Sequence, residues 1–152
     1  MLKLMKHSIY NLYGGLTFYF GRLYTQNSLL IHRQDFSYTF TPSRLIFPRS
    51  FLWDDGFHQM VVVKYNPKIV IEMLEGWVRK IDTFGWIGRE QIRGYEMSAM
   101  MPDSTYIFQD WFEMNPPTLM LPILYLIQNK DQFSNDIRQQ TNGFIMNNYK
   151  KL

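Results

Sequence analysis

Apolar residues recur with helical spacing over several stretches of the chain. From Met5 to Leu23 they fall at steps of three and four residues, which predicts an amphipathic helix over about Lys3–Tyr24. Gly14 and Gly15 lie in the middle of this stretch. Because glycine destabilises a helix, the pair indicates either a break or the close approach of another backbone.

The clearest helical pattern begins at Asn66-Pro67 and ends at Phe84-Gly85. Its polar face carries Glu75 and Arg79 four residues apart, a spacing that stabilises a helix. Its apolar stripe consists of Val70, Met73, Leu74, Trp77, Val78 and Ile81.

Two more helices are predicted towards the C-terminus. Residues 115–118, Asn-Pro-Pro-Thr, open the first, because proline is tolerated in a first helical turn. Residues 119–127 are apolar on every side, which predicts a helix that is buried on all faces and bent at Pro122. The second runs from about Asp131 to Tyr149. Its weak apolar stripe is formed by Phe133, Ile137 and Phe144.

The remaining segments show no sustained period. Residues 25–48 predict a long loop with a short extended piece, residues 86–96 a loop with one or two helical turns, and residues 97–114 irregular structure. Residues 59–63 are the best strand candidate, but their neighbours favour a short helix that ends near Val63. The pattern as a whole predicts an all-α fold of helical hairpins joined by long loops.

Composition and charge exclude several classes of function. The 152 residues suffice for one domain, and the absence of cysteine excludes disulfides and thiolate metal sites. The net charge is only +3 and the basic residues are scattered, so we expect no nucleic-acid binding. The three histidines lack companions at metal-ligand spacing, so we expect no metal or other cofactor. No apolar run is long enough for a membrane span, so we expect no membrane contact by this segment.

The densest group of chemically active side chains is the stretch 47–59, Phe-Pro-Arg-Ser-Phe-Leu-Trp-Asp-Asp-Gly-Phe-His-Gln. It places two carboxyl groups, an arginine and a histidine among large aromatic rings. Sugars stack their apolar faces on such rings, and carboxyl groups cleave glycosidic bonds, so the stretch indicates a carbohydrate site. Aromatic residues make up 17% of the chain, an excess that indicates ligand surface or faces that contact further protein.

Asp54 has two interpretations. Between Trp53 and Phe57 its carboxyl group would be desolvated, which raises the pKa of a carboxyl group and suits a general acid. The simpler interpretation is a helix N-cap, which residue type alone favours. The neighbouring Asp55 points in another direction, so it is expected to be the cap or a hydrogen-bonding partner.

Other candidates are equally open on residue type. His58 binds a sugar hydroxyl or, as its type favours, packs as a hydrogen-bonded histidine. Arg49 either clamps a substrate or forms a structural ion pair, and Trp86 is either a sugar platform or a plug at a helix end. Glu90 and Glu96 would lie on opposing sides of a continuous helix, so only a bend between them would aim both at one pocket.

Three ordered motifs carry a family resemblance. They are the stretch 47–59, the run Gly85-Trp86-Ile87-Gly88-Arg89-Glu90-Gln91-Ile92 with Gly94, and the run Asn115-Pro116-Pro117-Thr118-Leu119. Residues 12–16, with Tyr19-Phe20-Gly21, add a fourth stretch upstream. Over roughly residues 8–128 the chain resembles the processing α-glucosidase I enzymes of glycoside hydrolase family 63, the mannosyl-oligosaccharide glucosidases.

The resemblance implies part of an (α/α)6 toroid, with about five helices, in an inverting hydrolase that uses no metal. The family trims the terminal α-1,2-linked glucose from the N-glycan precursor in the endoplasmic reticulum lumen, so the implied partner is a glucosylated oligosaccharide. The resemblance places the general acid on Asp54, which reverses the preference for a cap. The implied substrate contacts are Arg49, Trp53, His58, Trp86, Glu90, Gln91 and Glu96.

Two departures from the family pattern matter. Tyr95 stands where the family has an acid, which bears on the finer specificity of the pocket. The family's catalytic domain is also longer, and its general base lies downstream of the Asn-Pro-Pro helix. An inverting mechanism needs a second carboxyl group about 6.5–9.5 Å from the acid, and no residue here is a defensible candidate. We therefore expect residues 1–152 to be a fragment of a single catalytic domain, inactive without the remainder of that domain.

Two other interpretations compete with a glycosidase fragment. The first is a non-catalytic carbohydrate-binding or interaction module derived from the same fold. The second is a trehalase-like relative, which the run from Gly85 to Gln91 disfavours. The resemblance leaves open whether a parent protein is anchored in a membrane.

Overall fold

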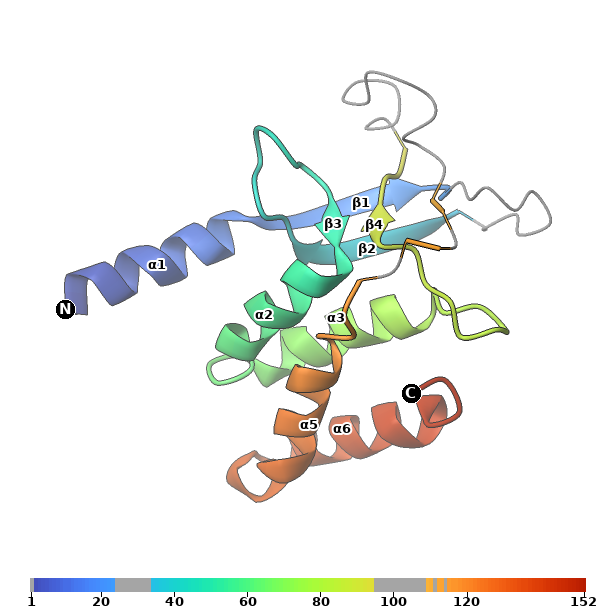
Figure 1. The fold of residues 1–152 in the computed structure, drawn as a ribbon. Coiled ribbons are helices and arrows are strands. Elements are labelled where there is room, and N and C mark those ends of the chain that lie inside the picture. The colour runs from blue at the N-terminus through green and yellow to red at the C-terminus, as the bar shows by residue number, and fades with distance from the viewer. Residues whose placement is uncertain (1, 24–33, 95–108, 111, 114) are drawn as a thin grey trace.

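The computed structural model describes residues 2–23, 34–94, 109–110, 112–113 and 115–152. These residues contain five α-helices and two small antiparallel sheets (Figure 1). The elements are α1 (Leu2–Gly14), β1 (Leu16–Gly21), β2 (Asp35–Phe40), β3 (Ser50–Phe51), α2 (Leu52–Val62), α3 (Pro67–Val78), β4 (Glu90–Gln91), α5 (Met120–Gln128), the 3-10 turn η2 (Lys130–Gln132) and α6 (Asn135–Asn148). The predicted predominance of helix is confirmed, whereas the strands correct the all-α assignment.

The first helix is shorter than predicted. Helix α1 ends at Gly14 and projects away from the rest of the molecule (Figure 1). At Gly15 an added Cβ would lie 2.7 Å from the carbonyl oxygen of Thr41, whose amide donates to the Gly15 carbonyl at 2.8 Å. Both expectations for the glycine pair therefore hold: the helix breaks, and another backbone approaches closely.

The residues after Gly15 form a hairpin rather than a helical stripe. Strands β1 and β2 pair antiparallel, from Leu16 opposite Phe40 to Gly21 opposite Asp35. Aromatic residues and threonine favour strands, and their alternation places the rings of Phe18, Phe20, Phe36 and Tyr38 on one face of the hairpin. The prediction of a helix up to Tyr24 is therefore wrong from Gly15 to Leu23, and the extended piece predicted within residues 25–48 is β2.

Helix α3 begins where predicted but ends at Val78, short of the predicted end at Phe84-Gly85. Asn66 is the N-cap, and its side-chain oxygen accepts from the amide of Ile69 at 3.3 Å, while Pro67 occupies the first turn. The apolar stripe of α3 packs against β2, α2, α5 and α6. The buried core comprises Phe40, Val62, Val63, Val70, Ile71, Met73, Leu74, Val78, Ile123, Leu126 and Phe144.

Helix α5 is only partly covered, contrary to prediction. It packs on α2 and α3 through Ile123 and Leu126, but three of its leucine and isoleucine side chains remain exposed. They are Leu121, Leu124 and Ile127. Pro122 is the third residue of the helix, where its missing amide hydrogen has no helical acceptor to lose, so no bend follows from it.

The last predicted helix is α6. The side chain of Ser134 caps it by accepting from the amide of Ile137 at 3.4 Å, and Phe144 reaches the core. Within the described ranges, no helix combines the length and the apolar character that crossing a bilayer requires.

Candidate functional site

Strands β3 and β4 bring two of the sequence motifs together. Ser50 pairs with Gln91 and Phe51 pairs with Glu90. The amide of Leu52, the first residue of α2, donates to the carbonyl of Arg89 at 3.0 Å. The N-terminus of α2 is therefore fixed beside the strand that carries Glu90. The helical turns predicted for residues 86–96 are wrong at this strand, because a non-local pairing determines its conformation.

The third motif packs on the same helix end. The hydroxyl of Thr118 donates to the carbonyl of Trp53 at 2.7 Å, and the side-chain amide of Asn115 donates to the carbonyl of Arg89 at 3.4 Å. Thr118 lies so close to Gly56 that a Cβ at residue 56 would collide with both its backbone and its side chain. Glycine at this position therefore allows the three motifs to converge.

Glu90 is held by two guanidinium groups. Arg49 Nε lies 2.6 Å from Glu90 Oε2, and Arg89 Nη2 lies 2.9 Å from Glu90 Oε1. The amide of Glu90 donates to the side-chain oxygen of Gln109 at 3.0 Å. The side chains of Arg49 and Glu90 are only 11% and 10% exposed. The structural ion pair proposed for Arg49 is therefore present, and the Glu90 carboxylate is fixed rather than left open for proton transfer.

Aromatic rings enclose the same arginine. The guanidinium carbon of Arg49 lies 5.1 Å from the ring centroid of Phe51 and 5.7 Å from that of Phe47. Such contacts stabilise a partly desolvated cation. Aromatic residues on β3 and before it thus help to hold the ion pair in place.

Asp54 lies in the first turn of α2, a helix that also carries two exposed rings. The Trp53 and Phe57 side chains are 43% and 50% exposed, and their ring centroids are 6.0 Å apart with an edge-on geometry. Desolvation raises the pKa of the half-buried Asp54 carboxyl group, and the charge of His58 opposes that shift. The general-acid interpretation requires a raised pKa of this kind.

Neither aspartate caps the helix by its side chain. The N-cap residue is Phe51, which makes no side-chain cap, so the cap interpretation of Asp54 and Asp55 is wrong. Both acids lie in the first turn, where the helix dipole favours negative charge.

Asp55 is fully buried and acts as a hydrogen-bond acceptor. It accepts from the Phe40 amide at 3.1 Å, from Gln59 Nε2 at 2.9 Å and from Trp77 Nε1 at 2.6 Å. Burial raises the pKa of this carboxyl group, and the hydrogen bonds counteract the rise. The expectation of a hydrogen-bonding partner is confirmed. Because Asp55 ties α2 to β2 and α3, it fixes the first turn of α2, which also carries Asp54.

Gln91 belongs to a buried polar frame. Its side-chain oxygen accepts from Arg93 Nε at 3.1 Å and Nη2 at 2.7 Å, and Arg93 Nη1 donates to the carbonyl of Gly21 at 2.9 Å. Burial lowers the pKa of Arg93 to about 10. Sequence reasoning missed Arg93, whose importance comes from contacts with the distant hairpin.

The remaining candidates differ in accessibility. Trp86 is 5% exposed and exchanges hydrogen bonds with Asp82 after the end of α3, as a helix-end plug would. His58 packs edge-on against Phe40 at 6.1 Å, and its buried Nδ1 has no hydrogen-bond partner among the described residues. Glu96 lies outside the described residues.

The site therefore presents a partly desolvated carboxyl group and exposed rings near a helix end that is fixed to the strand of the arginine–glutamate pair. No group of three or more metal-ligating side chains occurs in the part of the chain that the structure describes. Carboxyl groups among aromatic rings are typical of glycoside hydrolases.

Comparison with known proteins identifies the family of the chain. The family model for the glycosyl hydrolase family 63 C-terminal domain matches residues 1–152. The chain is 33% identical to alpha-glucosidase 2 of Arabidopsis thaliana, over 97% of the chain and 20% of that protein. It is 35% identical to mannosyl-oligosaccharide glucosidase GCS1 of the same plant, over 79% of the chain and 15% of that protein. It is 32% identical to the mannosyl-oligosaccharide glucosidase of Saccharomyces cerevisiae, over 91% of the chain and 20% of that protein.

The chain belongs to glycoside hydrolase family 63. This result confirms the resemblance carried by the three motifs. The chain spans only about a fifth of the length of these relatives, or less.

Proposed function

We propose that this chain forms part of the catalytic domain of an inverting α-glucosidase in which Asp54 is the general acid. The observation that carries the proposal is the position of Asp54. Its half-buried carboxyl group lies in the first turn of α2, a helix that also carries the exposed Trp53 and Phe57, and this helix end is fixed to the Glu90 strand. Desolvation there favours the protonated acid that the reaction needs.

In the proposed reaction, Asp54 donates its proton to the glycosidic oxygen as the bond between that oxygen and the anomeric carbon breaks. A water molecule attacks the anomeric carbon from the opposite face and gives its proton to a second carboxylate. Glu90 is unsuited to that second role because arginines engage both of its oxygens. The proposed role of Arg49 and Glu90 is to shape the pocket and to contact sugar hydroxyls.

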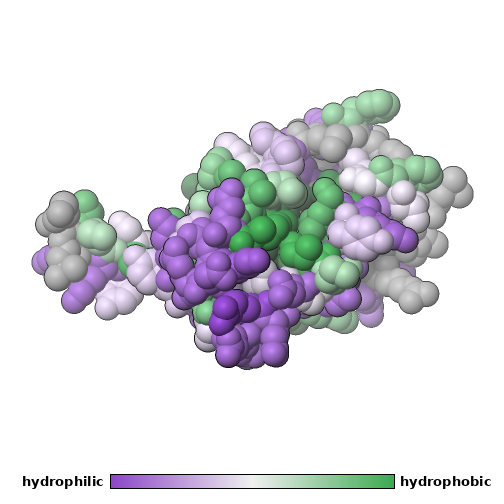
Figure 2. All heavy atoms as spheres, turned by 90° about the horizontal axis from the view of Figure 1, so that it is seen from below, coloured by the Kyte–Doolittle hydropathy of each residue, from purple (hydrophilic) through white to green (hydrophobic). Residues whose placement is uncertain are grey.

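The general base and the rest of the substrate site are proposed to come from the remainder of a longer catalytic domain that closes an (α/α)6 toroid. Two features support this view: the chain covers about a fifth of its relatives, and apolar side chains lie exposed on α2 and α5. Figure 2 shows hydrophobic side chains gathered in the middle of one face. An apolar face of this kind is typical of a surface that contacts further protein.

The names of two relatives suggest the substrate. Because they are mannosyl-oligosaccharide glucosidases, we propose that the substrate is the terminal α-1,2-linked glucose of the N-glycan precursor. The corresponding compartment is the endoplasmic reticulum lumen. Trp53 and His58 are the proposed contacts nearest to the acid in sequence, and Glu96 and Gln91 are retained as proposed pocket residues.

A second candidate is a non-catalytic sugar-binding or interaction module. The interaction form of this module is favoured by the burial of Trp86 and Gln91 and by the engagement of both Glu90 oxygens, because these groups have little surface left for a sugar. Such a module would keep the fold without turnover.

The test is Asp54→Asn in the full-length polypeptide that carries this segment. The variant should lose glucose release from a glucosylated N-glycan oligosaccharide by about 10²–10⁴-fold and keep its binding. Asp131→Asn is the matched control, because the Asp131 side chain is 84% exposed on a distant turn. Unchanged turnover in the Asp54 variant would remove Asp54 from the acid role. Glucose release by residues 1–152 alone would overturn the need for a base supplied from elsewhere.

A further inference from the structure

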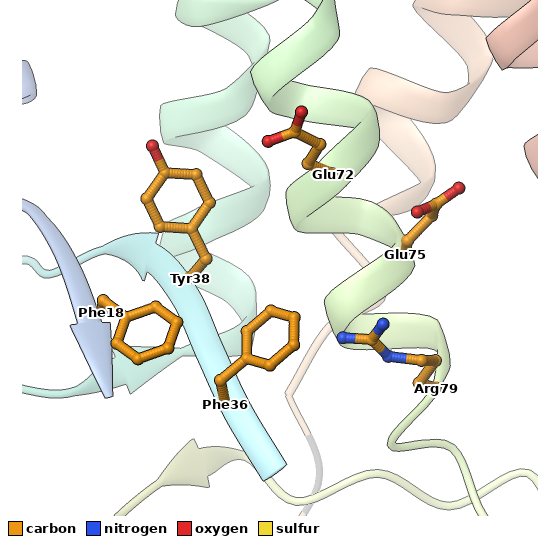
Figure 3. A pocket seen from close by; sticks show the side chains of 6 residues that line it. All are labelled: Phe18, Phe36, Tyr38, Glu72, Glu75 and Arg79. Carbon is orange, nitrogen blue, oxygen red and sulfur yellow. The ribbon is translucent and has the colours of Figure 1, made fainter. Parts of the chain in front are cut away.

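A pocket lies between the β1–β2 hairpin and helix α3 (Figure 3). Its volume is about 390 Å³, within the range of small-molecule pockets. Its walls are Phe18, Phe36 and Tyr38 from the strands and Glu72, Glu75 and Arg79 from the helix.

This pocket is separate from the acid site. Successive side chains of a strand point to opposite faces, so Phe36 and Tyr38 face away from the side of Ser37. Ser37 faces β3, where its hydroxyl lies 3.0 Å from that of Ser50. The pocket therefore opens on the opposite face of β2 from the strand pair that holds Glu90.

One wall of the pocket is a pair of stacked rings. The ring centroids of Phe18 and Phe36 are 5.5 Å apart and the planes differ by 17°. Phe18 is 61% exposed, so its ring contributes little to the core. An accessible flat ring of this kind is a stacking surface for the apolar face of a sugar.

The other wall supplies hydrogen-bonding groups. The Glu72 carboxylate is directed towards Tyr38, and the Arg79 guanidinium is directed towards Phe36 (Figure 3). Burial and the charge of Glu72 raise the pKa of Tyr38, so its hydroxyl remains a donor. Arg79 and Tyr38 thus provide donors, while Glu72 and Glu75 provide acceptors, and a sugar hydroxyl can pair with both kinds of group.

We propose that this pocket binds a hexose residue of an oligosaccharide, with the sugar ring stacked on Phe18 and its hydroxyls bonded to Glu72 and Arg79. A cationic ligand fits less well because Arg79 already lies over Phe36, 4.7 Å from its ring centroid. An apolar ligand would desolvate three charged side chains without compensation. The pocket chemistry stands independently of Asp54, and only the choice of an α-glucosyl probe rests on the proposed function.

The experiment titrates the ¹⁵N-labelled 152-residue chain with maltotriose and follows amide chemical shifts. Saturable changes are expected at the residues that line the pocket. Phe18→Ala and Glu72→Gln should each weaken binding by about tenfold, because each removes one stacking or hydrogen-bonding contact. Phe20→Ala should leave the affinity unchanged. Phe20 is the matched control, since it is 57% exposed on the same face of the same strand but does not line the pocket.

Three results would overturn the proposal: absence of binding up to the solubility limit of maltotriose, shifts confined to the start of α2, or equal weakening by Phe18→Ala and Phe20→Ala. If the chain gives no dispersed spectrum, the same pair of variants is compared by calorimetry in the full-length polypeptide. Asp54→Asn should not alter binding at this pocket. A failure of the acid assignment is therefore distinguishable from a failure of the second sugar site.

Discussion

Removing the charge of Glu90 should destabilise the protein substantially. In Glu90→Gln, Arg49 would keep its contacts with Phe47 and Phe51 but would lose the carboxylate 2.6 Å from its Nε. Breaking one half of a buried ion pair typically costs about 3–5 kcal/mol, because the other charge is left uncompensated. Both side chains retain about a tenth of their exposure to solvent. We therefore expect the free energy of unfolding to fall by about 3 kcal/mol, at the lower end of that range.

The assay is urea unfolding followed by circular dichroism, with Arg49→Met and the double variant completing a thermodynamic cycle. The double variant should reduce stability by less than the sum of the two single variants, by about 1–2 kcal/mol, because both members of the Arg49–Glu90 pair are then absent. The control is Asp131→Asn, which removes an exposed partner 4.0 Å from Arg138 and should change stability by less than about 1 kcal/mol. A Glu90→Gln effect as small as that of the control would refute the buried-pair reasoning.

Two further outcomes follow from buried contacts. Burial, reinforced by the nearby Arg93, lowers the pKa of Lys80 to about 7 from the ordinary value of 10.5. Between these values the unfolded chain holds the proton that the folded chain has released, so stability should rise with pH by up to about 1.4 kcal/mol per pH unit. Urea unfolding at several pH values should show this slope in the wild type and a flatter one in Lys80→Met; equal slopes would contradict the assignment. Gly56→Ala should cost about 1–3 kcal/mol by overpacking against Thr118 and lower the melting temperature. Gly143→Ala, with open space around the new Cβ, should not be destabilising; equal melting temperatures for the two variants would refute the collision.

Local signals were sufficient to predict the start and the body of helix α3, although its end at Val78 precedes the predicted one. Asn66 and Pro67 mark its start, and its apolar stripe has a clear helical period, so nothing distant had to be known. The β1 strand was missed for the opposite reason. Leu16, Phe20 and Leu23 continue the helical spacing of the residues before them, although the same stretch also alternates as a strand does. Only pairing with β2 decides between the two patterns.

The candidate site shows the same division. Residue types and motifs were sufficient to single out Asp54 and the aromatic residues beside it. The two-residue strands β3 and β4 have no sequence period to detect, because their conformation comes from pairing with each other. The role of Asp55 likewise follows from donors on three separate elements, including Trp77, and no local spacing reports such an arrangement.

The most direct test of the acid assignment compares two substrates in the full-length polypeptide carrying Asp54→Asn. Fluoride is a good leaving group that needs little protonation, whereas a glycan oxygen needs a proton from the acid. We predict that kcat/KM falls by about 10²–10⁴-fold for the glucosylated oligosaccharide but by less than about tenfold for α-glucosyl fluoride. Equal losses for both substrates, or no loss for either, would contradict the assignment of Asp54 as the general acid.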